Sequence, residues 1–549
     1  MPKIKKPLIF LFSFALPMVV WAGNVPRETQ EFNRFQQDAK QQLEQFQQAR
    51  QQRWVEQHQY QQQQAEQNQA DLSQACLPYS GIRFVGFHLI DPTVFAPMQG
   101  ECLNETRLNQ LSRDITAAYL DLGYIYNPFQ FEDDHSGVLI MRVMEGKIAK
   151  LSGESSRLNF AMLMPNALGN PLNVKDLDQA LDQANKMAGS KVSVDVLPAK
   201  NGEIELAFVN DEKARFNGFI GADNYASKRV GRWQSRVGVN IDSPLGLSDT
   251  LYLSAAHSLK SFSHNFNRSV ALFHSVPYGY WTLSTFGSIS QFKYQIPLQQ
   301  TEAQQKGYTW QAAFRADYTF NRGSNSISSA YGQLERLRSK SYFQDALIQL
   351  QSPALTTMQW GVNHLQLFPN GSLIADINYE RGLKWWNATA NQGRDQPEGQ
   401  FNKWVADLNF NYFHQVFGQT FHQSARLLGQ YSQNYLPAIK QADFLGRYAI
   451  RGFNDLSQSN EKSIIWQNNL AWLYENENQQ ISPYVGLDLG IQKASSGDTH
   501  SQRALGYAIG LKIIHPRWQT QLEWATGRLF RSNQILQERS VYVNVNVYF

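Results

Sequence analysis

The last 337 residues of the chain, 213–549, alternate hydrophobic and polar positions with a period of two. Clear segments of this kind are residues 373–380, 505–513 and 521–526. The chain ends on one more, with one face made of Val541, Val543, Val545, Val547 and Phe549. Successive side chains of a strand point to opposite faces of a sheet, so this pattern predicts many half-buried β-strands.

The length of this region favours a membrane β-barrel. At roughly 21 residues per strand and connection, it holds about sixteen antiparallel strands. Aromatic residues make up 13% of the chain, including 24 Tyr and 13 Trp, although the mean hydropathy is negative. Transmembrane barrels combine these features, because lipid-facing residues alternate with lumen-facing ones and aromatic girdles mark both interfaces. Composition alone also allows a large secreted β-protein. A soluble sandwich, however, does not need so many strands or an aromatic terminus.

Residues 75–212 have the pattern of a small α/β module used twice. In the first unit, 75–146, Asn104 is the expected N-cap of a helix and Gly123 lies just past its end. The helix is expected to bury Leu108, Leu111, Ile115, Ala118, Tyr119 and Leu122. The predicted strands of this unit span residues 82–90, 124–131 and 138–144.

The second unit, 147–212, repeats this order after about 65 residues, which indicates an internal duplication. Its helix is predicted at 174–188, ending at Gly189, and buries Val174, Leu177, Leu181 and Ala184. Two strands, 191–197 and 203–209, are joined by Asn201-Gly202, a typical hairpin turn.

Residues 1–22 predict a secretory signal peptide. Lys3, Lys5 and Lys6 precede an apolar stretch at 8–20, and Ala22 provides a small residue at the cleavage site. The alternative, an uncleaved transmembrane helix, needs about 20 apolar residues.

Residues 23–50 and 51–74 form a polar region that contains 18 Gln between positions 30 and 70. In the first part an apolar stripe recurs at spacings of three and four, which predicts a helix with the stripe Phe32, Phe35, Ala39, Leu43 and Phe46. The second part loses this spacing and is interpreted as a Gln-rich linker. Periodicity alone allows a coiled coil or a disordered tail equally well.

Composition and motifs restrict the chemistry. The net charge is +4, from 50 basic and 46 acidic residues, which gives no argument for a nucleic-acid partner. The only two cysteines, Cys76 and Cys102, predict a disulfide in an oxidising compartment, and they are too few for a metal site. The sequence contains no P-loop, no zinc-protease motif and no hydrolase nucleophile elbow. We therefore expect no enzyme activity and no cofactor.

Several short motifs resemble the TpsB family, the transporters of two-partner secretion. Cys76-Leu77-Pro78, residues 118–124 and Met144-Glu145-Gly146-Lys147-Ile148 are similar to the start, the helix-to-strand passage and the junction of that family's two POTRA domains. At the start of the barrel, similar positions are Asp223-Asn224, Gly231, Ser243-Pro244-Leu245-Gly246, Asp249 and Pro277-Tyr278-Gly279-Tyr280-Trp281.

Two later motifs are the most specific. Residues 450–453, Ile450-Arg451-Gly452-Phe453, resemble the VRGY-type motif at the tip of the family's sixth extracellular loop. Residues 484–490 resemble its F-x-G-x-D motif on a barrel strand. Ile450, Phe453 and Tyr484 depart from the family pattern, but each is conservative for an apolar contact.

The resemblance implies that the long loop folds into the barrel and that Arg451 pairs with Asp488 on the wall. An arginine suits this place, because its planar fork matches the two oxygens of a carboxylate. The implied loop-to-wall set is Arg451, Gly452, Phe453, Gly486, Asp488 and Gly490, with Phe549 as the C-terminal barrel signal. Taken alone, the two charges would instead be a solvated loop arginine and a lumen carboxylate.

The resemblance also implies the whole architecture. A signal peptide (1–22), a plug helix (23–50) and a linker (51–74) would precede two POTRA domains (75–146 and 147–212) and a barrel of about sixteen strands (213–549). The protein would lie in the outer membrane with its POTRA domains in the periplasm.

The implied function is export of a large TpsA-type exoprotein, an adhesin, haemolysin or contact-dependent inhibition toxin, which enters unfolded and crosses without ATP. Outer-membrane lipids and, during biogenesis, the barrel assembly machinery are the other expected partners. A BamA-like insertase is the main alternative, disfavoured by the two modules and the helix before them. A passive porin has no duplicated module, and a barrel enzyme would carry its catalytic motif.

Overall fold

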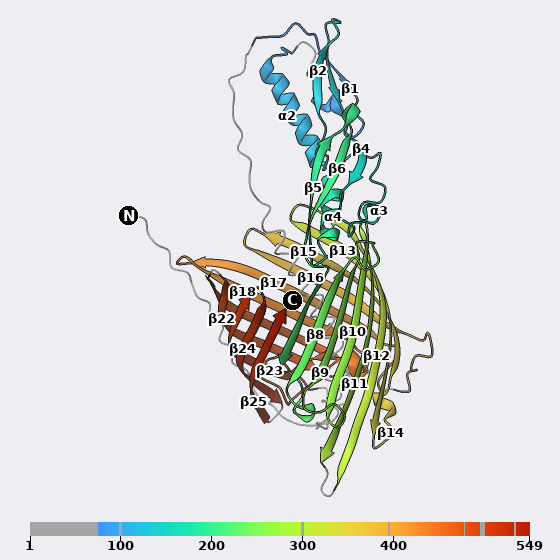
Figure 1. Ribbon diagram of the computed structural model, residues 1–549, viewed down its shortest axis with the longest axis vertical. Coiled ribbons are helices and arrows are strands. Elements are labelled where there is room, and N and C mark those ends of the chain that lie inside the picture. The colour runs from blue at the N-terminus through green and yellow to red at the C-terminus, as the bar shows by residue number, and fades with distance from the viewer. Residues whose placement is uncertain are drawn as a thin grey trace.

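The computed structural model describes residues 75–97, 101–297, 301–393, 396–476, 478–494, 500–531 and 534–549. The expected signal peptide, stripe helix and linker lie outside these residues. The described chain forms two small α/β modules that stand in line on one end of a closed β-barrel (Figure 1).

In the first module, one helix packs on a three-stranded sheet of order β1-β3-β2, formed by β1 (Ile82–Val85), β2 (Phe129–Asp133) and β3 (Leu139–Val143). The side chain of Asn104 caps α2 (Glu105–Asp121), as predicted, by accepting from the backbone N–H of Arg107. The core of the module combines Leu111, Ile115 and Tyr119 of the helix with Met141 and Val143 of β3.

Two strands of this module are shorter than predicted. The strand expected at 82–90 ends at Val85, because Gly86 adopts a φ of +86° and the chain turns into η1 (Pro92–Phe95). The strand expected from residue 124 begins only at Phe129, because Tyr124 pairs instead with Asn173 of the second module and the Tyr126 carbonyl accepts from Gly146 N–H. Leu122, expected in the buried helix face, is 48% exposed, since it is the C-cap residue.

The second module has the sheet order β4-β6-β5, formed by β4 (Ile148–Ser152), β5 (Ser190–Pro198) and β6 (Ile204–Glu212), with η2 (Lys200–Gly202) at the predicted turn. Its helices are α3 (Phe160–Leu163) and α4 (Val174–Ala184). Helix α4 ends four residues before the predicted end, where Asn185 exchanges two hydrogen bonds with the backbone of Val192. Val174 and Leu181 are only partly buried, whereas Gln179 and Gln183 are buried.

In the part of the chain that the structure describes, sixteen long antiparallel strands close the barrel (Figure 1). They are β7 (Phe216–Asp223), β8 (Gln234–Asp242), β9 (Thr250–Ser258), β10 (Phe266–Tyr278), β11 (Trp281–Pro297), β12 (Glu302–Arg322), β13 (Ser326–Phe343), β15 (Ala354–Phe368), β16 (Gly371–Leu383), β17 (Asn402–Val416), β18 (Gln419–Tyr431), β21 (Lys462–Asn476), β22 (Gln479–Lys493), β23 (Gln502–His515), β24 (Trp518–Arg531) and β25 (Gln534–Tyr548). Short elements in their connections are η3 (Lys228–Val230), β14 (Ala346–Leu347), η4 (Gln349–Gln351), η5 (Ala438–Lys440), β19 (Ala442–Asp443) and β20 (Ser459–Asn460).

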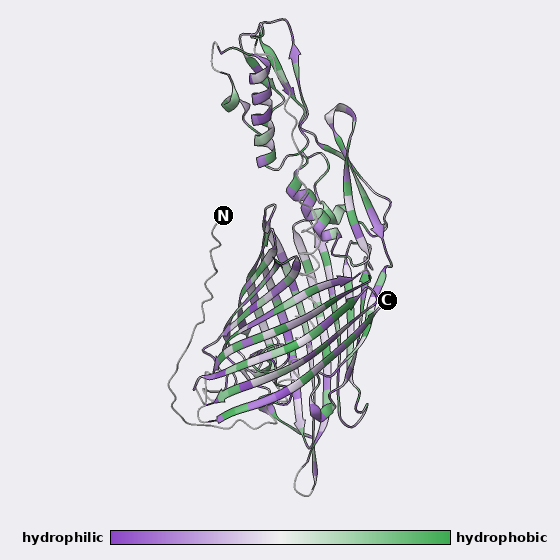
Figure 2. Ribbon diagram, turned by 90° about the vertical axis from the view of Figure 1, so that its left-hand side faces the viewer, coloured by the Kyte–Doolittle hydropathy of each residue, from purple (hydrophilic) through white to green (hydrophobic). Residues whose placement is uncertain are grey.

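The predicted alternation separates the two faces of the wall. Ile377, Ile509, Trp524 and Val541 are between 42% and 63% exposed on the outside, and hydrophobic and hydrophilic positions alternate along the strands (Figure 2). The outer face is therefore apolar, as a membrane requires. No helix in the described ranges is long and apolar enough to cross a membrane.

The first and last strands join along a short seam. Only residues 219–223 of β7 pair with β25, whereas the whole length of β24 pairs with the other edge of β25. Phe549 extends the seam, because its N–H and C=O both bond to the backbone of Gly218, 3.0 Å each. Beyond Asp223, the side-chain amide of Asn224 accepts from Val543 N–H (2.8 Å) and donates to the Val541 carbonyl (2.7 Å). Asn224 thus continues the ladder with a side chain.

Candidate functional site

The connection between β18 and β21, residues 432–461, folds into the barrel; we call it the long loop. Its apolar residues Phe444, Ile450 and Phe453 are buried against Ile465 and Leu529 of the wall. The loop therefore packs like a small core within the lumen, and its polar residues are held in place by this packing.

The structure brings Arg451 of the long loop and Asp488 of β22 together. The guanidinium donates from Nε to Oδ2 (2.7 Å) and from Nη2 to Oδ1 (2.5 Å), and the Arg451 backbone N–H also donates to Oδ2 (2.9 Å). Arg451 is 3% exposed and Asp488 is 0% exposed. This is the two-pronged geometry that an arginine offers and a lysine cannot reproduce.

Arg451 has further partners on the neighbouring strands. Its Nη1 donates to Asn469 of β21 (2.5 Å) and lies 3.5 Å from a carboxylate oxygen of Glu523 on β24. One side chain of the loop is thus bound to three wall strands.

Glycines on the wall make room for the loop. A Cβ on Gly486 would lie 2.5 Å from the Arg451 guanidinium, and one on Gly490 would lie 2.8 Å from the ring of Phe444. Gly486, Asp488 and Gly490 alternate along β22, so all three face the lumen. Gly452 needs its φ of +95°, and a Cβ there would collide with the backbone of Gly527. The spacing of both motifs therefore follows from the close packing of the long loop against the barrel wall.

Tyr484, the first residue of the wall motif, has a polar role that a phenylalanine could not have. Its hydroxyl donates to Glu523 (2.6 Å) and accepts from the side-chain amide of Gln521 (2.6 Å). The expectation of a purely apolar contact at this position was wrong.

Arg447 is a second loop cation that the sequence did not single out. It donates to Glu523 (3.0 Å), and its guanidinium lies 5.5 Å from the ring centroid of Tyr225 and 5.3 Å from that of Tyr542. Tyr225 follows β7 and Tyr542 belongs to β25, so Arg447 covers the seam from the inside. Tyr542 also donates its hydroxyl to the carbonyl of Phe453 (2.9 Å).

Lys440 anchors the loop to another part of the wall, and sequence analysis missed this residue too. Its ammonium lies 2.6 Å from Glu335 of β13 and 2.6 Å from Glu380 of β16, and Glu380 also pairs with Lys403 of β17 at 2.8 Å. All four side chains are at most 8% exposed. No local spacing in the sequence predicts this cluster, because its members come from four separate segments.

The motif residues near the start of the barrel lie mainly where the second module joins it. Asp249 accepts from the backbone of Leu245 and Leu247 and lies 2.7 Å from His274, which fixes the turn between β8 and β9. Asn159 of the module bonds to that turn through Ser248 (2.7 Å).

Buried polar groups fasten helix α4 to the barrel. The side-chain amides of Gln179 and Gln183 both donate to the carbonyl of Gly279 (3.2 Å each), and Tyr280 donates to Asp176 (2.7 Å). Arg322 of β12 donates to Gln179 (2.9 Å) and also pairs with Asp182. The second module is therefore bound firmly to one rim of the barrel.

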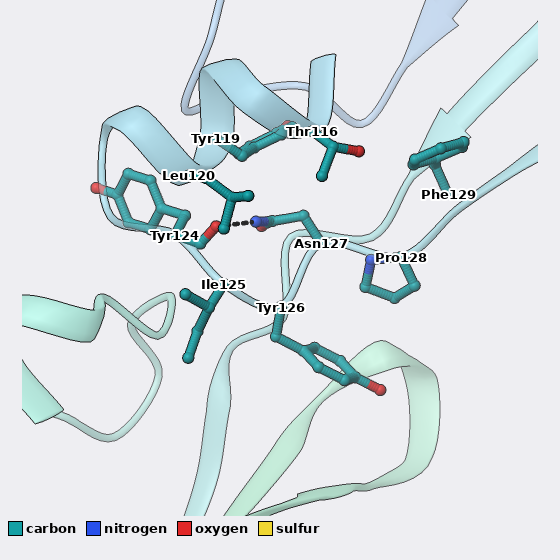
Figure 3. A pocket seen from close by; sticks show the side chains of 9 residues that line it. All are labelled: Thr116, Tyr119, Leu120, Tyr124, Ile125, Tyr126, Asn127, Pro128 and Phe129. Atoms are coloured by element: carbon teal, nitrogen blue, oxygen red, sulfur yellow. Dashed lines mark hydrogen bonds between the residues drawn. The ribbon is translucent and has the colours of Figure 1, made fainter. Parts of the chain in front are cut away.

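The first module contains a groove of about 250 Å³ between α2 and the edge strand β2 (Figure 3). Its lining is mostly apolar and aromatic: Thr116, Tyr119, Leu120, Tyr124, Ile125, Tyr126, Asn127, Pro128 and Phe129. Asn127 donates to the carbonyl of Tyr124 (3.0 Å) and shapes its floor. Among the described strands β2 pairs only with β3, so its outer edge presents backbone groups beside the groove.

Glu145 forms a junction beside this groove through Tyr119, which lines it. Glu145 accepts from the backbone N–H groups of His88 and Leu89 and from the hydroxyl of Tyr119, 2.8 Å each. Burial by itself would raise the pKa of Glu145, but these hydrogen bonds outweigh it and hold the pKa below its ordinary value. Glu145 thus ties helix α2 to the loop after β1.

Cys76 and Cys102 form a disulfide, with Cα atoms 5.4 Å apart. It ties the start of the first module to the residues just before α2. Within the described ranges, no group of three or more His, Cys, Asp or Glu gathers as a metal site would require.

Comparisons with known proteins bear on the whole chain. A family model described as haemolysin secretion/activation protein ShlB/FhaC/HecB matches residues 202–513. Models of a ShlB-type POTRA domain and of a POTRA domain match residues 77–146 and 145–198.

Two curated relatives are similar over most of their length. The chain is 33% identical to the hemolysin transporter protein HpmB of Proteus mirabilis over 460 residues, 82% of each chain. It is 31% identical to the hemolysin transporter protein ShlB of Serratia marcescens over 471 residues, 85% of this chain and 84% of that one. Among solved structures, CdiB from Escherichia coli matches with a TM-score of 0.82 at 24% identity, covering 94% of this chain and 99% of that one, which concerns the fold.

Proposed function

The chain belongs to the haemolysin secretion/activation family of TpsB transporters, and on that premise we propose that it captures one large exoprotein as an unfolded chain and passes it through the barrel without ATP. It is an outer-membrane protein whose POTRA domains face the periplasm. Its partner is a TpsA-type exoprotein. The unfolded state of that partner and the source of energy are the new parts of the proposal.

The first POTRA domain supports recognition of an extended segment. The free edge of β2 offers a row of backbone donors and acceptors, to which a segment of the exoprotein can add as a strand. Phe131 on this strand is 36% exposed, and its ring lies 6.1 Å from that of Phe129, which lines the apolar groove. An unfolded chain presents backbone and apolar side chains together, whereas a folded partner has already paired its strands.

The long loop supports the transport step. At rest it fills part of the lumen and is bound by Arg451, Arg447 and Lys440 to several wall strands. An exoprotein can pass only when this loop moves, so the ion pairs set the closed state. The plug helix expected at 23–50 would add a second obstruction, but it lies outside the described residues.

The proposal that export needs no ATP rests on the location of the protein. The periplasm holds no ATP pool, so export must run downhill. Folding of the exoprotein at the cell surface buries apolar area, and the folded exoprotein cannot pass back through the barrel. Transport therefore runs outward.

The single observation that carries this function is the buried, multiply anchored loop in a POTRA-bearing barrel. Full-length protein is purified and inserted into liposomes with its POTRA domains outside. An exoprotein diluted from denaturant should then enter the interior of the liposomes without nucleotide, as judged by protease protection. Protection of a prefolded exoprotein to the same extent would contradict capture of an unfolded chain. Insertion of unrelated barrel proteins into the liposomes would favour the insertase alternative instead.

A further inference from the structure

The outer surface of the barrel carries a row of cations on β13. Glu335, Leu337 and Ser339 are buried towards the lumen, so the residues that alternate with them face outward. These are Arg336, Arg338 and Lys340, which we call the β13 cation row.

Strand β12 gives the depth of this row in the membrane. Its end at Arg322 contacts Gln179 of the second POTRA domain and is therefore periplasmic. Tyr318 lies near this end with its ring 4.8 Å from that of Trp281, as expected of an inner aromatic girdle. Trp310 lies eight residues further along the strand. At about 3.4 Å per residue and a tilt of about 40°, this is a height of about 20 Å, close to the roughly 25 Å of an apolar band.

Arg338 and Lys340 of the β13 cation row therefore lie at the outer boundary of the apolar band, and Arg336, opposite Ala312, lies one residue pair inside it. Arg338 lies directly opposite Trp310, and Lys340 lies opposite Tyr308, with its ammonium 5.9 Å from the ring centroid. Within the described residues, no carboxylate forms an ion pair with any member of the row. Three like charges at adjacent outward positions lower stability unless an anion neutralises them.

Other strands show the same separation of charge. Buried carboxylates of the wall, such as Glu335, Glu380 and Glu523, point inward and bind cations of the long loop. Cations point outward near the extracellular ends of other strands: Arg268, Lys293, Arg381, Lys493, Arg503 and Arg528. Outward cations therefore recur along the outer rim, where Lys306 is paired with Asp345 at 2.5 Å.

We propose that the β13 cation row binds the phosphate groups of a phosphorylated glycolipid of the outer leaflet, a lipid of the lipopolysaccharide class. The guanidinium groups of Arg336 and Arg338 suit two-pronged bonds to phosphate oxygens, and Lys340 adds a point charge. Ala312, beside Arg336, and Phe314, below it, also face outward, and Phe314 is 50% exposed. Acyl chains of the same lipid can cover this apolar surface, which a free phosphate ion would leave bare.

The test is lipid binding by the full-length protein in detergent micelles, measured by native mass spectrometry with purified lipid A. The variant R336Q/R338Q/K340Q should bind roughly fivefold more weakly per cation removed, on the order of 100-fold in all. The matched control K191Q/K200Q/K213Q removes three exposed cations from the second POTRA domain and its edge and should bind as the unmodified protein does. The variant R336K/R338K/K340R retains all three positive charges and should therefore keep most of the binding.

Three results would overturn the proposal. One is undiminished binding by the glutamine variant, and another is an equal loss in the POTRA control, which would reduce the effect to net charge. The third needs no variant: if lipid A stripped of its phosphates binds the unmodified protein as tightly, the acyl chains alone carry the contact.

Discussion

Glu335 on β13 and Glu523 on β24 lie eight strands apart in the order of the sixteen long strands, and the long loop binds both. Lys440 pairs with the first at 2.6 Å and Arg447 with the second at 3.0 Å. Only seven positions separate these two cations in the sequence. The loop is therefore a strap across the lumen, fixed at both walls, and a transport step that needs an open lumen must release at least one end.

The Lys440 end gives the first prediction. Lys440→Met leaves Glu335 buried without its partner, and losing one member of a buried ion pair costs about 3–5 kcal/mol. The barrel should lose its compact, heat-modifiable form at a lower temperature, and open-channel events should become more frequent in planar bilayers. K440M/E335Q should recover much of the stability, because Glu380 still has Lys403. Lys150→Met, which breaks an exposed pair with Glu205, is the control and should change stability by less than about 1 kcal/mol.

The seam gives a second prediction. Asn224→Ala removes two hydrogen bonds that continue the β7–β25 ladder and should ease separation of the strands. Removing them should cost about 1–3 kcal/mol, because the Val541 and Val543 backbone groups lose their partner. Hydrogen exchange of residues 541–543 in the folded protein should accelerate. An unchanged exchange rate there, with acceleration elsewhere, would mean that Asn224 acts only on the loop that follows it.

Glu145 gives a prediction about pH. Its folded pKa lies below the ordinary value of 4.5, so its hydrogen bonds stabilise the fold above that pH and lose this contribution as the pH falls through the folded value. Glu145→Gln should therefore destabilise the first POTRA domain at neutral pH by about 1–3 kcal/mol and make its melting less sensitive to acid. Calorimetry of the full chain between pH 3 and 7 measures both. A parallel downward shift of the whole curve would assign the residue a purely steric role.

The expected plug helix, 23–50, gives a prediction from the sequence alone. Deleting it should raise single-channel conductance, because a polar helix with a narrow apolar stripe suits a water-filled lumen. A deletion within the linker, 51–74, is the control. Equal conductance of all three proteins would mean that the segment does not occupy the barrel.

The sequence predicted best what depends on local periodicity and on repeated motifs. The alternation in residues 541–549 and the cap at Asn104 each follow from neighbours in the chain, and the structure has both. Gly486, Asp488 and Gly490 could be placed on one face because a strand alternates, and the opposite charge of Arg451 completed the pair.

What failed depends on distant parts of the chain. Gln179 and Gln183 were not among the residues that the helical pattern predicted to be buried, but the barrel rim covers them and supplies the carbonyl of Gly279. Lys440 meets Glu335 and Glu380 only after the barrel has closed, so no window of sequence contains the cluster. Tyr484 was misjudged for the same reason, since its partner Glu523 lies on a strand two places away.

The last prediction concerns Arg451 and Asp488. Alanine at either position leaves the other charge buried without its partner, at 3% and 0% exposure, and frees the loop at the motif. Each single variant should insert into the outer membrane but secrete poorly, measured as exoprotein at the cell surface per folded barrel. R451A/D488A should be no worse than either single variant, because residues that share one interaction are not additive. Arg451→Lys tests the geometry: a lysine keeps the charge but not the two-pronged contact, so it should recover only part of the secretion. K440A/D488A is the matched control pair, since Lys440 binds Glu335 and Glu380 and shares neither partner with Asp488 or Arg451 in the structure; its two defects should multiply. If the defects of R451A and D488A multiply in the same way, the two residues act independently, and their contact does not hold the loop for secretion.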